Sequence, residues 1–279
     1  MEQILKELDS LFASGQTKQV EPFLIRHLEQ AEQEGEYASA VTLRSELGGF
    51  YRACGRLEES EQAFRSAAGY MEKDGRERES SYGTLLINLA GTLRLQKRVR
   101  EAMELYDRAE EVLAEIGERG YLLASLYNNR SLALQDMDCG EEAVMMLKKA
   151  LSLIREIPGS EEEQAITHTN LAVLLGNTGR PEEEEEELEQ ALFLFREMNC
   201  DNNPHFAAAL SAMGNCCFRR GEYARALDAY EQAARLMLKL FGKNREYEVI
   251  LHNAKQARQK IAESGGMAES GGEEEAVEK

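Results

Sequence analysis

Turn-forming residues, most of them glycines, recur along this chain at nearly constant intervals. One series steps by 40, 42, 41, 41 and 42 residues, through Gly15, Gly55, Lys97, Asp138, Gly179 and Gly221. A second series steps by 40, 42, 42, 43 and 40 residues, through Gly35, Gly75, Gly117, Gly159, Asn202 and Gly242. Gly and Asn enter the left-handed conformation that ends many helices at little cost. The spacing therefore predicts regularly placed helix ends, and so a stack of similar units.

Between these marks, apolar residues recur at steps of three and four, as on one face of a helix. Leu85, Leu89 and Leu93 form one such run. Sustained alternation typical of strands is absent, and three of the four prolines (Pro158, Pro181, Pro204) fall at expected helix starts or connections. The sequence predicts an all-α fold.

Small and large residues keep a fixed register to the first series. Seven positions before each mark from Gly55 onward the residue is small: Gly48, Ala90, Ser131, Ala172 and Gly214. Nine positions after it the residue is large, and twelve after it stands alanine: Phe64, Tyr106, Leu147, Leu188, Tyr230, then Ala67, Ala109, Ala150, Ala191, Ala233. This register resembles the tetratricopeptide repeat (TPR), in the long variant of kinesin-light-chain-like arrays. Five matching units cover 38–241, and a sixth at 1–35 keeps the spacing alone.

The resemblance implies a right-handed TPR α-solenoid of about six helix-turn-helix repeats with a C-terminal capping helix. We expect the solenoid over 1–264, with repeats near 1–35, 36–75, 76–117, 118–159, 160–202 and 203–242 and a capping helix over 244–263. Residues 265–279 are rich in Gly and Glu and have no apolar stripe, so we expect a disordered acidic tail.

Charge and composition exclude several classes of partner. The chain carries 51 acidic and 33 basic residues, a net charge of −18, whereas nucleic-acid and anionic-membrane binding need a basic surface. No apolar run is long enough to span a membrane, and the N-terminus lacks the features of a secretory signal. Five cysteines (Cys54, Cys139, Cys200, Cys216, Cys217) form no CxxC pair, which fits a reducing cytoplasm.

The sequence gives no indication of an enzyme. The four histidines (His27, His168, His205, His252) show no metal-ligand spacing, and no phosphate-binding glycine loop occurs. Cys216 and Cys217 adjoin on an expected helix and so point to different faces, and buried inert thiols are expected. We therefore expect no catalytic residues, no metal and no cofactor.

Asparagines recur where the resemblance implies a peptide-binding groove. In TPR arrays the first helix of each repeat lines a concave surface that binds extended peptides, and Asn nine positions before the turn mark contacts the peptide backbone. Asn88, Asn129 and Asn170 hold that position, and Asn128, Asn177 and Asn215 are expected on the same face. An amide offers both a donor and an acceptor to a peptide bond. Alternatively, these asparagines bond to neighbouring helix ends and set the geometry between repeats.

Arginines also map to this face. Arg52, Arg94 and Arg219 lie two or three positions before turn marks, and Arg binds carboxylates bidentately, which suggests a ligand with acidic groups. Pairing with the chain's own acidic residues is the alternative.

Two residues depart from the family pattern at positions expected to be buried. Arg130 is either a groove cation or a packed stem with its head in water, and Glu184 lies in the run 182–187, expected to be a solvated helix face.

Together these features predict a non-enzymatic, cytoplasmic protein-protein interaction scaffold that binds an extended peptide or partner segment. Two alternatives stay open. One is a peptide-sensing regulatory protein that acts through a separate effector. The other is a self-assembling scaffold, a homo-oligomer joined through its solenoid ends.

Overall fold

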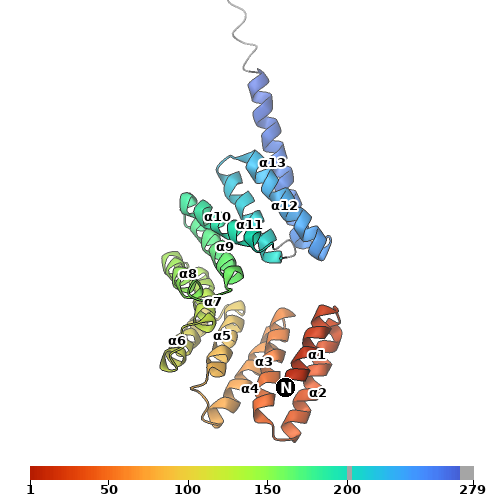
Figure 1. Ribbon diagram of the computed structural model, residues 1–279, viewed down its shortest axis with the longest axis vertical. Helices are drawn as coiled ribbons and strands as arrows, with labels where there is room; N and C mark the ends of the chain where they lie inside the picture. The colour runs from red at the N-terminus through yellow and green to blue at the C-terminus, as the bar shows by residue number, and fades with distance from the viewer. Residues whose placement is uncertain (200–202, 271–279) are drawn as a thin grey trace, which may run out of the picture. The chain divides into compact units, whose positions relative to one another are not determined.

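The protein is helical throughout the part that the structure describes. The structure is a computed structural model that describes residues 1–199 and 203–270. Within these ranges there are thirteen helices and no strands, which confirms the all-α prediction. The helices are α1 (Glu2–Ala13), α2 (Thr17–Gln33), α3 (Tyr37–Ala53), α4 (Leu57–Lys73), α5 (Ser80–Leu95), α6 (Val99–Glu115), α7 (Tyr121–Asp136), α8 (Gly140–Ile154), α9 (Glu161–Asn177), α10 (Pro181–Glu197), α11 (Pro204–Arg219), α12 (Tyr223–Phe241) and α13 (Arg245–Ser270) (Figure 1).

Left-handed residues end the helices where the sequence places turn marks. Every member of the first series has a positive φ, including the non-glycines Lys97 (65°) and Asp138 (59°). At Lys97 the following amide, Arg98 N–H, donates to the Leu93 carbonyl (2.9 Å), which is the bond of a Schellman cap. After α10 the left-handed residue is Asn199 (φ 53°). Asn202, the mark expected there, lies outside the described residues.

Five successive pairs of helices pack together, α1/α2, α3/α4, α5/α6, α9/α10 and α11/α12. Helices α7 and α8 come between the third and fourth of these pairs in the chain, and α13 follows the last. Each pair falls within one of the ranges expected for a repeat. Helix α13 continues to Ser270, beyond 263, where the sequence predicted that the capping helix ends. The sequence predicts an apolar stripe of Ile250, Leu251, Ala254, Ala257 and Ile261 on this helix. Ile250, Ala254 and Ala257 are buried, whereas Leu251 is exposed and Ile261 is only partly covered. Of the segment expected to be a disordered tail, 271–279 lies outside the described residues.

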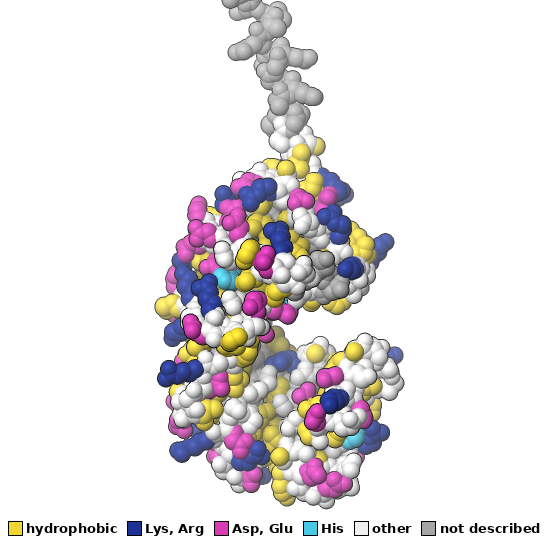
Figure 2. All heavy atoms as spheres, in the orientation of Figure 1, with side chains coloured by type: hydrophobic (Ala, Val, Ile, Leu, Met, Phe, Trp, Pro, Cys, Tyr) yellow, Lys and Arg dark blue, Asp and Glu magenta, His cyan; other side chains and the backbone are white. Residues whose placement is uncertain are grey.

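The chain divides into two compact units, Met1–Met146 and Leu147–Lys279, with the boundary inside α8. Within each unit a helix packs mainly on the helices one or two places along the chain. Unit 1 contains two apolar clusters, one around Leu24 and Leu43 and one around Leu89 and Tyr106. Unit 2 contains one cluster, from Ala165 on α9 to Ala257 on α13. On the face shown in Figure 2, acidic and basic side chains are interspersed over each unit.

The small–large register reflects close contact between the two helices of a pair. A Cβ atom added to Gly48 would lie 2.8 Å from the Phe64 ring, and one added to Gly214 would lie 2.5 Å from the Tyr230 ring. Real Cβ atoms do not approach other atoms so closely, so both sites require glycine while the rings keep their places. Along the described residues, no helix is long and apolar enough to cross a membrane.

Candidate functional site

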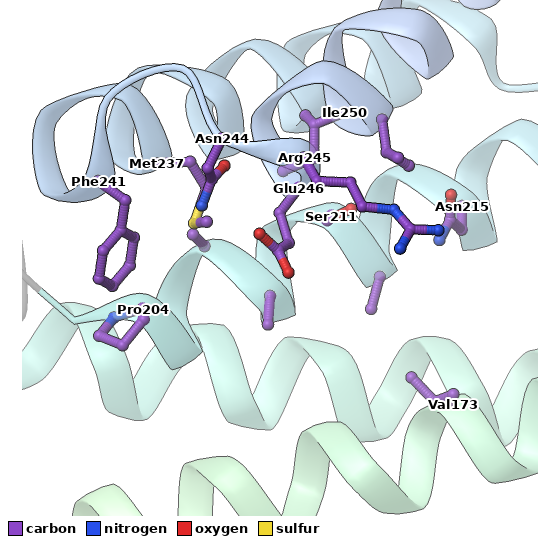
Figure 3. A pocket seen from close by; sticks show the side chains of 14 residues that line it. Val173, Pro204, Ser211, Asn215, Met237, Phe241, Asn244, Arg245, Glu246 and Ile250 are labelled. Atoms are coloured by element: carbon purple, nitrogen blue, oxygen red, sulfur yellow. The ribbon is translucent and has the colours of Figure 1, made fainter. Parts of the chain in front are cut away.

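A cavity of about 760 Å³ lies in unit 2, between α9, α11, the end of α12 and the start of α13. We call it the α11–α13 pocket (Figure 3). Its apolar walls include Val173, Ala208, Met237, Phe241, Val249 and Ile250. Its polar groups are Ser211, Asn215, Asn244, Arg245 and Glu246. An apolar hollow with a few polar groups is the usual form of a binding site. Of the predicted site residues, Asn215 is in this pocket.

Two amides of the pocket have their oxygens occupied by the fold. Asn215 Oδ1 accepts a hydrogen bond from the Tyr230 hydroxyl (2.7 Å). Asn244 Oδ1 accepts one from Tyr247 N–H (2.8 Å) and so caps α13. Each amide therefore keeps an NH₂ group to offer as a donor. Figure 3 shows the Arg245 side chain extending across the pocket in the direction of Asn215, and the Glu246 carboxylate pointing into the pocket away from the guanidinium.

The exposed face of α9 continues the polar surface. Asn170, Val173 and Asn177 recur at steps of three and four on this helix and are all exposed. Val173 lines the α11–α13 pocket. Neither Asn170 nor Asn177 hydrogen-bonds another residue in the described part of the chain. Both amides therefore have donors and acceptors that the described residues do not use.

In unit 1, Asn88 is held by the arginine of the preceding repeat. Arg52 Nη1 donates to the Asn88 carbonyl (3.2 Å) and Arg52 Nη2 to Asn88 Oδ1 (3.3 Å). The guanidinium carbon lies 5.8 Å from the centre of the Phe64 ring. Burial lowers the pKa of Arg52 from its ordinary value. No carboxylate pairs with Arg52 within residues 1–199 and 203–270.

Tyr106 lies under the same group of side chains. The side chain is fully buried (0% exposed), and within the described residues its hydroxyl has no hydrogen-bond partner. Burial raises the pKa of Tyr106 to about 12, against the opposing charges of Arg94 and Arg52. Unit 1 therefore contains a partly buried cation without a counter-ion beside a hydroxyl without a partner.

The other predicted groove arginines have carboxylate partners, as the alternative interpretation proposed. Arg94 Nη1 is 2.9 Å from Asp136 Oδ2. Arg219 pairs with Glu184. Arg130 is a third case: it contacts Asp107 (2.6 Å) and Glu110 (2.7 Å) on α6, so it ties α7 to α6.

Two of the predicted asparagines bond within their own helix. Asn129 Nδ2 donates to the Ser125 carbonyl (2.9 Å), and Asn128 Nδ2 donates to the Ala124 carbonyl (3.2 Å). Both bonds join a residue to the one four places before it. In both bonds the NH₂ group of the asparagine donates to a backbone carbonyl of α7 itself, so neither bond reaches the end of a neighbouring helix.

Glu184 corrects the expectation that the glutamate run of α10 is a solvated face. Its side chain is 2% exposed. Gly176 of α9 provides the space, since a Cβ there would lie 2.5 Å from the Glu184 carboxyl group. Two neighbours in the run are also engaged, because Glu185 pairs with Arg225 (3.0 Å) and Glu187 contacts buried His168. Residues three or four positions apart on this helix, such as Glu184, Leu188 and Ala191, are buried, so a continuous charged run cannot remain solvated throughout.

The thiols and histidines do not converge on a reactive centre. Burial raises the pKa of Cys216 to about 12 and also raises that of Cys217, which disfavours the reactive thiolate. Cys200 lies outside the described residues. In the part of the chain that the structure describes, no three His, Cys, Asp or Glu residues are grouped so that they could hold a metal.

Family models agree with the repeat register. Tetratricopeptide repeat models match residues 122–197 and 207–239. The chain is a tetratricopeptide repeat protein with repeats of the kinesin-light-chain type. Its described residues have the helix pairs of a TPR solenoid.

Individual relatives are distant. Protein KINESIN LIGHT CHAIN-RELATED 3 of Arabidopsis thaliana is 23% identical over 203 residues, 71% of this chain and 31% of the relative. The TPR chain thus spans about a third of the length of the Arabidopsis relatives it matches. The crystal structure of BtubC (BKLC) from P. vanneervenii is 19% identical, with a TM-score of 0.68 over 85% of this chain and 93% of that one. NprR in complex with its cognate peptide NprX is 14% identical, with a TM-score of 0.57 over 100% and 82%.

Proposed function

We propose that this TPR protein is a non-enzymatic, cytoplasmic scaffold that binds an extended peptide or partner segment on the first helices of its repeats. The observation that carries the proposal is the α11–α13 pocket, where apolar walls surround amide groups whose NH₂ donors are free. The fold likeness to NprR, which was solved with a peptide, supports a ligand of this kind.

The asparagines would hold the peptide backbone. Asn170 is exposed and, within the described residues, has no other hydrogen bond, so its amide can bond a peptide N–H and C=O together. In unit 1, Asn88 uses its Oδ1 atom to accept from Arg52, so its NH₂ group would donate to the peptide. Asn129 uses its NH₂ group to donate to Ser125, so its Oδ1 atom would accept from the peptide. Arg52 would bind an acidic group, because within the described residues no carboxylate neutralises it.

Filling the pocket tests the proposal. Peptides selected from a random display library on the full chain would be measured against Ala208→Trp, which places a large ring in the pocket from an exposed position of α11. Ala224→Trp, at an exposed position of α12 outside the pocket, is the matched control. We expect about a tenfold or greater loss of affinity in Ala208→Trp alone. Equal affinities in the two variants would exclude the pocket as the binding site.

The asparagines need a second test. The triple variant Asn88→Ala, Asn129→Ala, Asn170→Ala should bind the selected peptides more weakly while its helicity and Tm change little. A large fall in Tm with unchanged affinity would instead give these residues a structural role.

A further inference from the structure

We propose that the buried Glu184 carboxylate, which lies next to the α11–α13 pocket, receives a lysine or arginine side chain of the bound segment. The incoming cation would donate to Glu184 Oε2, and the Arg219 side chain would turn aside into solvent. This inference rests on the proposed function and specifies one residue type of the partner.

Glu184 has hydrogen-bonding capacity that the fold leaves unused. Its side chain is 2% exposed, and within the described residues its Oε2 atom has no hydrogen-bond partner. Arg219 Nη2 donates to the other oxygen, Oε1. The adjacent Glu185 is less buried, yet Arg220 and Arg225 each donate to one of its two oxygens. Because burial makes an unsatisfied oxygen costly, Glu184 gains more from a further donor than a solvated carboxylate does.

The Glu184 carboxyl group lies just below the surface of α9. A Cβ added to Gly176 would lie 2.5 Å from it, and Gly176 is itself half-buried. The second and third repeats have Arg52 and Arg94 at the register of Gly176, whereas the glycine adds no side chain over the carboxylate. The Arg219 side chain that contacts Glu184 is 50% exposed, so it can turn into solvent by rotation about its own bonds.

The α11–α13 pocket is close enough for one extended segment to reach both sites. Val173 on α9 and Asn215 on α11 line the pocket, and these two helices contact each other. Gly176 follows Val173 by three residues and Arg219 follows Asn215 by four, so each lies about one helical turn further along its helix. A turn rises about 5.4 Å, and alternate side chains of an extended chain are roughly 7 Å apart. A segment with one side chain in the pocket can therefore place another at Glu184.

The charge of the chain attracts basic segments. The net charge of −18 raises the local concentration of cations around the molecule. Asn177, the exposed residue that follows Gly176, makes no hydrogen bond within the described residues, so its Oδ1 atom can accept from a bound cation as well. An ammonium or guanidinium group has several donors and can use more than one acceptor.

Selection from a random peptide display library tests the inference. The unaltered full chain, Glu184→Ala and Glu186→Ala would each select peptides, which are then sequenced. Alanine suits the first of these positions, since Ala102, Ala143 and Ala226 hold the same register in other repeats. Glu186 is exposed and has no ion pair within the described residues, so its variant controls for the loss of one charge. We expect the unaltered chain and Glu186→Ala to enrich Lys or Arg about tenfold at one peptide position, and Glu184→Ala to enrich neither.

A second variant tests the exchange with Arg219. A selected basic peptide, and the same peptide with norleucine in place of its Lys or Arg, would be measured by fluorescence anisotropy at a temperature where circular dichroism shows each variant folded. Arg219→Gln should bind the basic peptide about threefold or more tightly than the unaltered chain does, because the peptide no longer displaces a cation. It should bind the norleucine peptide within about twofold of the unaltered chain. Arg235→Gln, at an exposed position of α12 outside the pocket, should change neither affinity by more than about twofold.

Any of three results would overturn the inference: no enrichment of Lys or Arg by the unaltered chain, the same enrichment by Glu184→Ala, or an Arg219→Gln variant that binds the basic peptide no more tightly. Selected peptides that lack a basic residue but lose affinity in Ala208→Trp would overturn the inference and leave the proposed function standing. A selection that recovers no peptide would overturn both.

Discussion

The third and sixth repeats have a tyrosine at the same register, Tyr106 and Tyr230. The Tyr230 hydroxyl makes a hydrogen bond, whereas that of Tyr106 has no partner within the described residues. Tyr230 of the sixth repeat donates to Asn215. Six positions before its own turn mark, the third repeat has Gly91 in place of that asparagine. Arg52 of the second repeat fills the space, with Nη1 3.1 Å from where a Gly91 Cβ would lie. With Gly91 in place of an asparagine, the third repeat lacks the neutral hydrogen bond that Tyr230 makes within the sixth repeat. It has instead a charged contact with Arg52 of the preceding repeat.

The two repeats also differ one position earlier. There the third repeat has Ala90, which the Tyr106 ring accommodates, and the sixth has Gly214, against which the Tyr230 ring is packed. The bonded tyrosine is therefore the one with less room around its ring. We expect the sixth repeat to be the less tolerant of change.

Gly214→Ala should have the largest effect, because the added methyl group would lie 2.5 Å from a ring held by Asn215. We expect the free energy of unfolding to fall by about 1–3 kcal/mol in urea denaturation. Gly49→Ala on α3 is the control, since no atom lies within 4 Å of its added Cβ. That variant should gain up to about 1 kcal/mol from helix propensity. If both variants shifted alike, steric contact with Tyr230 would not explain the register.

Arg219→Gln should destabilise unit 2 by roughly 1–2 kcal/mol, because it leaves the buried Glu184 carboxylate without its cation. Thermal and urea unfolding would measure the loss. Adding Glu184→Ala should restore most of it, since Ala102, Ala143 and Ala226 hold this register in other repeats. A double variant no more stable than the single one would contradict the pairing.

Tyr230→Phe and Tyr106→Phe compare the two hydroxyls directly. Removing the Tyr230 hydroxyl breaks its bond to Asn215 and should cost about 1 kcal/mol. Removing the Tyr106 hydroxyl breaks no bond within the described residues and should leave stability within about 0.5 kcal/mol of the unaltered chain. The urea midpoint reports both, and a reversal of this order would overturn the comparison.

Glu46→Gln should have the smallest effect on the free energy of unfolding. The dependence of that effect on pH would show that it comes from the ionisation of Glu46. Glu46 holds in the second repeat the position that Asn88 holds in the third, and burial raises its pKa above the ordinary 4.5, with Asp9 contributing. A carboxyl group whose folded pKa is raised lowers stability as the pH rises from its unfolded pKa to its folded pKa, and the loss is complete above the folded pKa. The variant should therefore be more stable than the parent near pH 7, with the gain vanishing below about pH 4.5. A gain independent of pH would point to another cause.

The helix pairs could be predicted from the sequence because their ends depend on local backbone preference. Gly and Asn report that preference directly, and even Lys97 and Asp138 were found from spacing alone. Arginine partners could not be predicted in this way. Arg94 reaches Asp136, 42 positions on, whereas Arg219 reaches back 35 positions to Glu184. Only the first separation matches the repeat step of 40–43 residues, so the choice of partner depends on which carboxylate lies within reach once the helices have packed.

The pocket was missed for a related reason. The sequence predicts a capping helix after the last repeat, and the stripe of Ile250, Ala254 and Ala257 is buried in the structure. Arg245 and Val249 lie off that stripe and contribute to the pocket. Arg245 and Asn215 line the same pocket because of the turn between α12 and α13, which the sequence pattern does not define.

Packing between near neighbours has a consequence for how the chain folds. Helices that contact only the next one or two helices close short loops, which costs little entropy, so folding can be rapid and can begin in more than one repeat. It also limits how far damage spreads. A lesion at Gly214 should open the sixth repeat to hydrogen exchange while the amides of α3 and α4 keep their protection.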